Sequence, residues 1–245
     1  MSDISNFFLK DGYIENVNTS SLDTDSKAQH EFWTTERLTA ANYYQFHVYS
    51  FAARFARRKS LTIISDVGCG PAVKTAHFFS GQEYKVYLYD QESCRSICAT
   101  QMPTADFYSV NLESATIITQ TQKCDLVICS DVLEHLANPG ECIELCKRLV
   151  STNGYIIFST PERDQLRGMD CMASGHPQHI REWNRREFIQ LLKHFELTII
   201  QSKLLPQHAL GVFERMRYRI TGGWHKPRKY RSCHLTLCSP QQVNS

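Results

Sequence analysis

Short apolar runs alternate with helical stretches from residue 61 onward, and this alternation restricts the fold more than any other feature of the sequence. The runs are rich in Ile, Val, Leu, Phe and Tyr, as strands buried on both faces are. Because strand–helix–strand crossovers are right-handed, the pattern predicts a doubly wound α/β domain with a mostly parallel sheet. The predicted strands are Leu61–Asp66, Lys85–Tyr89, Ala105–Val110, Asp125–Cys129, Tyr155–Ser159, Leu197–Lys203 and His234–Cys238.

Helix signals stand before and between these strands. Apolar side chains recur at helical spacing over Thr34–Arg58, which predicts a helix ahead of the first strand. Asn138 followed by Pro139 is typical of an N-cap with proline at the first helical position. Asn184 followed by Glu187 resembles a capping box and predicts a second helix start.

Composition excludes several classes of protein. The net charge of +2 argues against a protein that binds polyanions through overall charge. No apolar run approaches the roughly 20 residues needed to cross a bilayer, and the N-terminus lacks the pattern of a secretory signal. The 10 cysteines lack the two-residue spacing common at zinc sites, so we expect reduced, partly buried thiols in a cytoplasmic protein.

The N-terminal segment differs from the rest of the chain. Residues 1–26 hold five acids against one base, together with Ser, Thr and Asn, which indicates a mobile arm or a lid rather than a core element. We therefore predict an N-terminal arm and cap helix over residues 1–59 and one domain over residues 60–245. An insertion at about 162–183 and a basic segment at 211–232 are expected on the substrate side of that domain.

A glycine turn, Ser65-Asp66-Val67-Gly68-Cys69-Gly70-Pro71, follows the first predicted strand directly. Gly68 and Gly70 allow a tight turn and close contact between ligand and main chain, and the N–H groups of the next helix are expected to face the same crevice. Asp90 ends the second strand 22 residues after Gly68, close to the spacing at which an acid binds ribose hydroxyls. The pair predicts a cofactor that carries adenosine.

The run Asp66-Val67-Gly68-Cys69-Gly70-Pro71 resembles the first motif of class I S-adenosylmethionine-dependent methyltransferases. The resemblance implies a Rossmann-like sheet whose seventh strand is antiparallel beside the sixth, with the helical extension at its N-terminus. It also implies S-adenosyl-L-methionine as cofactor and S-adenosyl-L-homocysteine as product. Ala72 replaces the third glycine common in that superfamily, which is expected to narrow the turn slightly.

The resemblance assigns cofactor contacts to individual residues. It implies that the glycine turn surrounds the methionine part, that the end of the second strand binds the ribose, and that the next strand end meets the adenine. An arginine in the preceding helix is expected at the cofactor carboxylate, although simple helix packing by its cluster, Trp33, Arg37, Tyr43, Tyr44 and Gln45, is an equal alternative. The implied cofactor residues are Arg37, Asp66, Gly68, Cys69, Gly70, Asp90, Gln91, Asn111, Leu112 and Ser130.

Two histidines are the candidate catalytic residues. The run Ser130–Leu136 and the later run Gly175–Trp183 resemble motifs of bacterial O-methyltransferases that act on sugars and other small hydroxylated metabolites. A hydroxyl acceptor is too weakly acidic to react unaided, and imidazole titrates near neutral pH. His135 is therefore the first candidate for the base, and His179 is the second.

A metal site is the alternative to a histidine base. Asp131, Glu134 and His135 would share one helical face. Related ubiquinone-pathway O-methyltransferases and small-RNA end methyltransferases place a divalent ion on a similar Glu-x-x-Glu-His run, but Asp131 is one methylene shorter than the first glutamate. The other interpretation is that Glu134 only orients the segment through hydrogen bonds.

The sequence leaves the methyl acceptor open. Residues 214–231 hold seven bases against one acid, which indicates either a solvated insertion or a flap for an anionic acceptor such as a phosphorylated sugar or RNA. We expect O-methylation of a sugar or similar small metabolite. The alternatives are an RNA methyltransferase with a metal-assisted Glu-His site and a non-catalytic module that binds the cofactor.

Overall fold

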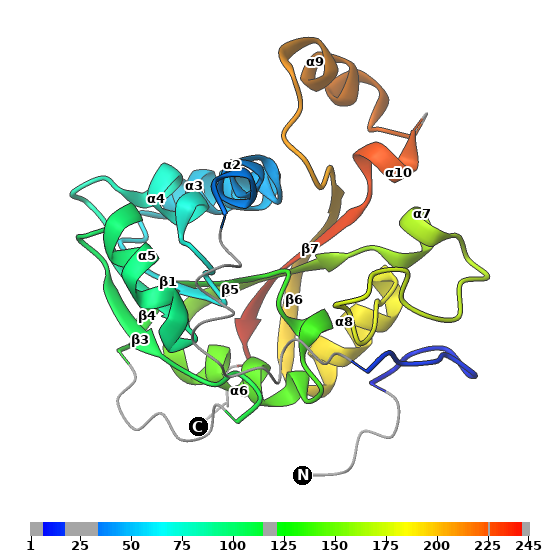
Figure 1. Ribbon diagram of the computed structural model, residues 1–245, viewed down its shortest axis with the longest axis horizontal. Helices are drawn as coiled ribbons and strands as arrows, with labels where there is room; N and C mark the ends of the chain where they lie inside the picture. The colour runs from blue at the N-terminus through cyan, green and yellow to red at the C-terminus, as the bar shows by residue number, and fades with distance from the viewer. Residues whose placement is uncertain (1–6, 18–33, 115–121, 225, 242–245) are drawn as a thin grey trace.

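A seven-stranded sheet forms the centre of the molecule, in the order β3-β2-β1-β4-β5-β7-β6 (Figure 1). The computed structural model describes residues 7–17, 34–114, 122–224 and 226–241. Strand β7 is antiparallel to both of its neighbours, and the other pairs are parallel, which confirms the predicted sheet. The strands are β1 Ile63–Val67, β2 Lys85–Asp90, β3 Asp106–Ser109, β4 Cys124–Ser130, β5 Val150–Pro161, β6 Leu197–Leu205 and β7 Cys233–Pro240.

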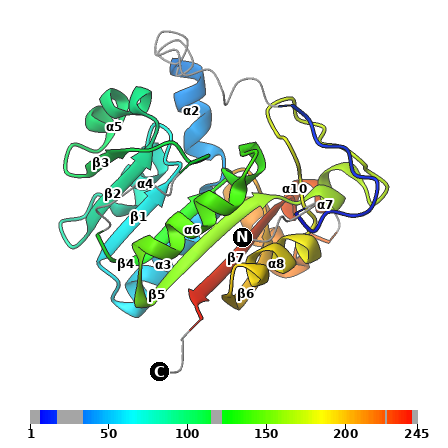
Figure 2. The same ribbon diagram turned by 90° about the horizontal axis from the view of Figure 1, so that it is seen from below.

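Helices cover both faces of the sheet. Figure 2 shows α6 and α8 in front of it, while α3 and α4 lie on the other side. None of the helices in the described parts of the chain is long and apolar enough to cross a membrane. The helices are α2 Thr35–Tyr43, α3 Phe46–Lys59, α4 Val73–Phe79, η1 Glu92–Cys94, α5 Arg95–Gln101, η3 Leu133–His135, α6 Pro139–Leu149, α7 Arg163–Arg167, α8 Arg185–His194, α9 Val212–Thr221 and α10 Pro227–Tyr230.

Successive side chains of each inner strand enter two different cores, which explains the continuous apolar runs. In β2, Val86 and Leu88 pack with α3 and α4, whereas Tyr87 and Tyr89 belong to the core on the α6 and α8 face. A strand with both faces covered has no position left for an exposed polar side chain. Both predicted helix starts are found, and Asn184 and Glu187 form the complete capping box of α8.

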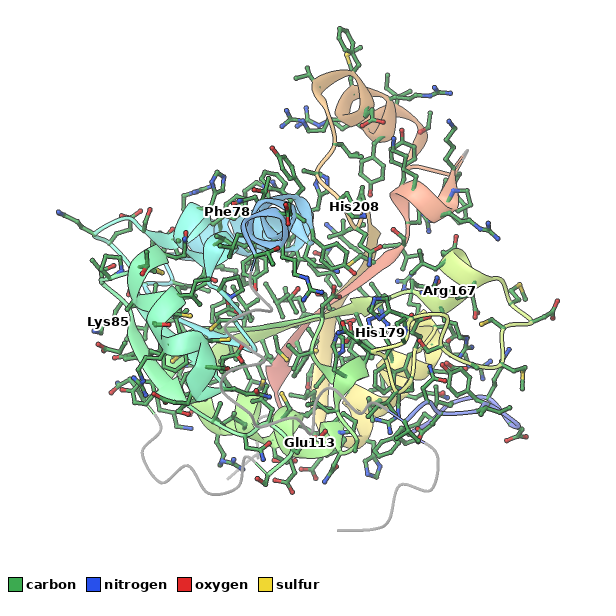
Figure 3. All side chains as sticks on the ribbon, in the orientation of Figure 1. Phe78, Lys85, Glu113, Arg167, His179 and His208 are labelled. Atoms are coloured by element: carbon green, nitrogen blue, oxygen red, sulfur yellow. The ribbon has the colours of Figure 1, made fainter. Side chains whose placement is uncertain are left out.

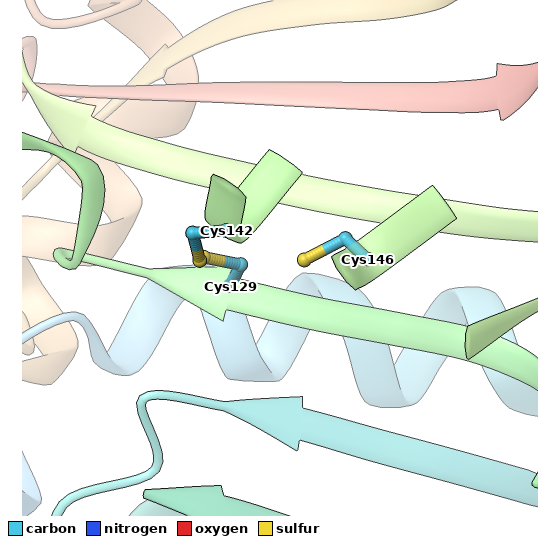
Figure 4. Close-up of side chains that lie close together, drawn as sticks. All are labelled: Cys129, Cys142 and Cys146. Carbon is cyan, nitrogen blue, oxygen red and sulfur yellow. The ribbon is translucent and has the colours of Figure 1, made fainter. Parts of the chain in front are cut away.

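Three cysteines meet inside the core between β4 and α6 (Figure 4). Cys129 Sγ lies 3.8 Å from Cys142 Sγ, and Cys146 completes a group with all sulfurs within 4.8 Å of one another. All three are buried in the apolar core of that face. The group therefore packs as small apolar side chains. All ten cysteines are free thiols, and all but Cys171 are buried.

The predicted helix over residues 34–58 is wrong in one respect, because it is broken into α2 and α3. Gln45 takes a left-handed conformation with φ of 54°. Its N–H donates to the carbonyl of Gln207 at 2.6 Å, and the Ala209 N–H donates to the carbonyl of Tyr43 at 2.8 Å. Pairing with the loop after β6 thus replaces helical hydrogen bonds at the break. That loop is distant in sequence, so local periodicity carries no sign of it.

The expectation that the N-terminal arm stays out of the core is also wrong for its described part. Leu9 is buried in the core on the α6 face. The Trp183 indole donates to the Phe7 carbonyl at 3.0 Å, and the Tyr13 hydroxyl accepts from the Glu182 N–H at 2.9 Å. Residues 7–17 therefore lie along the 162–183 insertion and hold it against the sheet.

Candidate active site

The glycine turn and the run Asp131–His135 lie at the ends of neighbouring strands, β1 and β4. The chain turns toward β2 after β1 and toward β5 after β4, so this is the point where the strand order reverses. A doubly wound sheet opens a crevice at such a point, beyond the carboxyl ends of its strands. The glycine turn and the run Asp131–His135 thus lie at one location.

The glycine turn packs closely against the end of β4. Gly68 has φ of +72°, and a Cβ added there would lie 2.3 Å from Cγ2 of Val132. Ala72 also takes a left-handed φ, 56°, and the helix begins after it at Val73 rather than near Pro71. The replacement of glycine by Ala72 therefore places an L-residue in a conformation that glycine adopts without strain.

Asp90 is held by the glycine turn itself. Its Oδ2 accepts from the Gly70 N–H at 2.7 Å, and its Oδ1 accepts from the Gln91 N–H at 2.7 Å. Burial raises the pKa of Asp90, while these two backbone donors oppose the rise. The acid is therefore fixed at the end of β2 beside the turn, at the place predicted for a ribose-binding acid.

Asp66 makes contacts that the sequence did not reveal. Both of its carboxylate oxygens accept from the Tyr49 hydroxyl at 3.1 Å, and Thr75 donates to the same carboxylate. Burial raises the pKa of Asp66 to about 6, against the effect of these donors and of Lys74. Tyr49 and Thr75 occupy ordinary apolar-face positions of α3 and α4, so periodicity assigns them to packing.

The remaining cofactor candidates each lie in a different local setting. Asn111 Oδ1 accepts from the Glu113 N–H at 3.0 Å in a turn after β3, and Leu112 packs against the core. The Ser130 hydroxyl pairs with that of Ser159 at 2.7 Å, which joins β4 to β5. Arg37 is exposed on α2, the helix beside α4, and Trp33 lies outside the described residues.

Three predicted side chains converge at the end of β4. The ligating atoms of Glu134, His135 and His179 all lie within 4.8 Å of one another. The two imidazole rings meet edge to face, with centroids 4.7 Å apart. The short helix η3 presents Glu134 and His135, and the 162–183 insertion brings His179 to them. We call these three residues the Glu-His-His cluster.

Each histidine of the cluster is oriented through Nδ1. His135 Nδ1 lies 2.8 Å from the Gln178 carbonyl oxygen, so this nitrogen donates and the lone pair is on Nε2. His179 Nδ1 lies 2.8 Å from Glu182 Oε1. Glu182 is fully buried and also accepts from Arg167, at 3.0 and 3.1 Å. Figure 3 shows Arg167 beside His179.

Glu182 and Arg167 are functional candidates that the sequence analysis missed. Glu182 belongs to the run Gly175–Trp183, which was the available signal, but its partner Arg167 is 15 residues away in the chain. Hydrogen bonds from His179 and Arg167 outweigh burial and hold the pKa of Glu182 at about 2. The carboxylate is therefore charged, and it fixes the ring of His179.

Two buried carboxyl groups lie in and beside the cluster. Within the described chain, Asp131 Oδ1 and Glu134 Oε1 are buried without a hydrogen-bond partner. Burial raises the pKa of both carboxyls, and burial together with His179 lowers the pKa of His135 to about 4. The structure thus joins Glu134 and His135 to His179, whereas their spacing in the sequence predicts a group with Asp131. Asp131 lies next to Glu134 with a left-handed φ of 55°.

A sequence profile of the family described as "Methyltransferase domain" matches residues 41–202. A ubiquinone biosynthesis O-methyltransferase from Glaesserella parasuis is 37% identical over 108 residues, 41% of this chain and 45% of that protein. One from Burkholderia orbicola is 27% identical over 97 residues, 36% of this chain and 42% of that protein. The matched segments thus span less than half of these relatives.

Solved structures share the fold at low identity. The 1,6-didemethyltoxoflavin-N1-methyltransferase of Burkholderia thailandensis, with S-adenosylhomocysteine bound, has a TM-score of 0.62 at 14% identity and covers 92% of this chain and 91% of its own. The [4+2]-cyclase SpnF has a TM-score of 0.62 at 13% identity and covers 94% and 100%. Since the second is named as a cyclase, the reaction has to be argued from the site.

Proposed function

The chain belongs to the methyltransferase domain family, and from that premise we propose that it transfers the methyl group of S-adenosylmethionine to a hydroxyl of a small metabolite. The observation that carries the proposal is the convergence of Glu134, His135 and His179 at the end of β4, beside the glycine turn. The cluster borders the crevice at the carboxyl ends of the strands, where a ligand of this fold binds and where the methyl acceptor would contact the cofactor.

The cofactor side of the proposal rests on the glycine turn and Asp90. The turn leaves its backbone open to close approach, and the following helix α4 directs N–H groups at the crevice. Asp90 is already fixed by two backbone donors, and its carboxylate has the spacing expected for the ribose hydroxyls. We assign the methionine part to the turn and the adenine to the Asn111–Leu112 end of β3.

The donor set of the cluster fits a divalent cation. It combines a buried carboxylate oxygen without a described hydrogen-bond partner, Glu134 Oε1, with two imidazoles whose Nδ1 atoms are engaged by oxygen acceptors. Histidine ligands are oriented in this way at metal sites. Glu134, His135 and His179 would hold the ion. When bound, the ion supplies positive charge that favours the deprotonated acceptor hydroxyl.

The chain's own residues then perform three tasks. The glycine turn and Asp90 position the cofactor, which carries its own leaving group. Glu182 and Arg167 keep the ring of His179 in one orientation. We assign the acceptor's proton to Asp131 Oδ1, which is buried beside Glu134 and has no described hydrogen-bond donor. The acceptor oxygen forms its bond to the methyl carbon as the bond from that carbon to sulfur breaks.

A methyl-transfer screen tests the proposal. Radiolabelled S-adenosylmethionine is offered with catechols, sugars, sugar phosphates and RNA ends, with and without a chelator. We expect transfer to a small hydroxyl acceptor that the chelator abolishes and a divalent ion restores. Transfer that resists chelation would overturn the metal part of the proposal and leave the proton with Asp131 Oδ1. Transfer to RNA alone, or cofactor binding without any transfer, would overturn the proposal.

A further inference from the structure

Helix α9 carries a set of exposed apolar side chains that no part of the proposed reaction uses. Phe213 is 85% exposed and Ile220 is 79% exposed, although both belong to residue types that are normally buried. The set consists of Val212, Phe213, Met216, Ile220 and the nearby Trp224. Exposed apolar side chains that gather in one place mark an interaction site. We call this set the apolar stripe.

The stripe occupies one face of α9 and has basic edges. At the 3.6 residues per turn of an α-helix, its four helical members fall within roughly 100° of the helix circumference. Arg215 and Arg219 follow one edge of the stripe, and Arg217 follows the other. Long basic side chains placed in this way can keep their charge in water while the face between them is buried.

The opposite face of α9 attaches the helix to the protein. The Tyr218 hydroxyl donates to the Leu204 carbonyl at 3.2 Å, and the Tyr218 ring packs near that of Tyr230. Glu214 pairs with Lys229 and accepts from the Gly211 N–H. Because this inner face is already occupied, the apolar stripe points away from the domain. Figure 1 shows α9 as an outlying element, well away from the sheet.

The charge around the stripe is predominantly positive. Residues 214–231 hold seven bases and one acid, and the single acid, Glu214, is already paired with Lys229. The guanidinium of Arg231 lies 3.7 Å from the ring centroid of Trp224. An amphipathic helix with a basic border and a nearby tryptophan is the pattern of a helix that lies in the headgroup region of an anionic bilayer.

A second copy of the chain fits this surface less well. A ten-residue helix is about 15 Å long, and its stripe is small beside the ~800 Å² per partner of a stable interface. Two copies would also bring the same basic borders together, which is unfavourable. An RNA partner accounts for the bases but leaves the aliphatic stripe in water.

We propose that α9 binds the protein to anionic membrane surfaces, with the apolar stripe inserted among the headgroups and the arginines at the phosphate level. The α9 excursion begins at the carboxyl end of β6, and the loop before it pairs with Tyr43 and Gln45 at the α2–α3 break. The proposal thus places the membrane on the side of the molecule that carries the candidate active site. It does not depend on the identity of the acceptor.

Vesicle sedimentation of the full chain tests the proposal. We expect the protein to sediment with phosphatidylcholine vesicles that contain about one third phosphatidylglycerol, and to stay in solution with phosphatidylcholine alone. The variant Phe213→Ser/Ile220→Ser is expected to lose at least about tenfold in partition coefficient. The matched control, Ile14→Ser/Val17→Ser, removes two exposed apolar side chains elsewhere and is expected to bind like the unmodified chain.

Tryptophan emission gives a second readout on the same samples. Trp183 is already buried. We expect a blue shift of the emission when vesicles are added, and we expect Trp224→Phe to abolish it. That result would report insertion at the stripe. The proposal is overturned if neutral and anionic vesicles behave alike, or if the stripe variant binds as the control does. It is also overturned if no form of the protein binds vesicles and the unmodified chain is a dimer where the stripe variant is a monomer. The same holds if no form binds vesicles and the unmodified chain binds RNA where the stripe variant does not.

Discussion

The contact between the glycine turn and the end of β4 can be tested by a paired substitution. Gly68→Ala places a Cβ 2.3 Å from Cγ2 of Val132 and retains a φ of +72°. An L-residue in the left-handed region costs about 1–2 kcal/mol, and overpacking at a buried contact adds about 1–3 kcal/mol. The variant is therefore expected to lose ~2–5 kcal/mol of unfolding free energy.

The double variant separates the two contributions. Val132→Ala alone is expected to cost about 2 kcal/mol through lost burial, but it also removes the methyl group that the new Cβ would strike. Gly68→Ala/Val132→Ala should then be less destabilised than the sum of the single variants by about 1–3 kcal/mol. Gly222→Ala is the matched control, because it has φ of +60° and its nearest neighbour is at 3.4 Å. It should show the conformational cost alone.

Urea unfolding measures the stability of the four variants, and calorimetry with S-adenosylmethionine measures how tightly each variant binds the cofactor. We expect Gly68→Ala to weaken cofactor binding by at least about tenfold, since the displaced turn is the proposed contact for the methionine part. The double variant should recover part of that loss. Additive stabilities would refute the packing described for this turn, and unchanged cofactor affinity in Gly68→Ala would refute its assignment to the cofactor.

Three further predictions follow from the contacts. In the folded protein the pKa of Asp66 is raised to about 6 from 3.8. The protonated carboxyl therefore adds to the free energy of unfolding at low pH, and this contribution is lost as pH rises. The free energy of unfolding of the wild type relative to Asp66→Asn should fall by up to about 3 kcal/mol between about pH 4 and pH 7. A difference that stays constant over that range would contradict the burial argument. Glu182→Gln should lower kcat by about 10–100-fold with unchanged cofactor affinity in calorimetry, because its partners are His179 and Arg167; a loss confined to cofactor affinity would place Glu182 elsewhere in the mechanism. Asn184→Ala should cost about 1 kcal/mol in urea unfolding, through loss of the α8 cap, and leave turnover intact; Asn184→Ser should retain most of that stability, and an equal loss in both variants would argue against the cap.

The strands were predictable because their apolar runs are set by burial on both faces. The exception is β5, which begins at Val150 rather than at Tyr155. Asn153 and Gly154 favour a turn locally, yet Val150 pairs with Cys124 of β4 across a register shift. Tertiary pairing overrides local preference there. The same cause breaks the predicted helix at Gln45, whose backbone partner lies beyond β6.

The candidate site was predictable to the extent that it is local. Asp66, Gly68 and Asp90 stand directly after strands, so their positions follow from the sheet. The motifs that contain His135 and His179 could be predicted, but the edge-to-face contact of the two rings depends on how the 162–183 insertion folds back. The support of His179 by Glu182 and Arg167 depends on the same insertion. Side chains that meet only through tertiary folding leave no periodic signal in the sequence.

The most direct test of the proposed function compares cofactor binding and methyl transfer in Glu134→Gln. The substitution keeps the size of a buried side chain while removing the carboxylate from the Glu-His-His cluster. We expect S-adenosylmethionine affinity within about threefold of the wild type and methyl transfer reduced by at least about 100-fold. Methyl transfer at the wild-type rate in this variant, with the same acceptor and ion, would contradict the assignment of the reaction to this cluster.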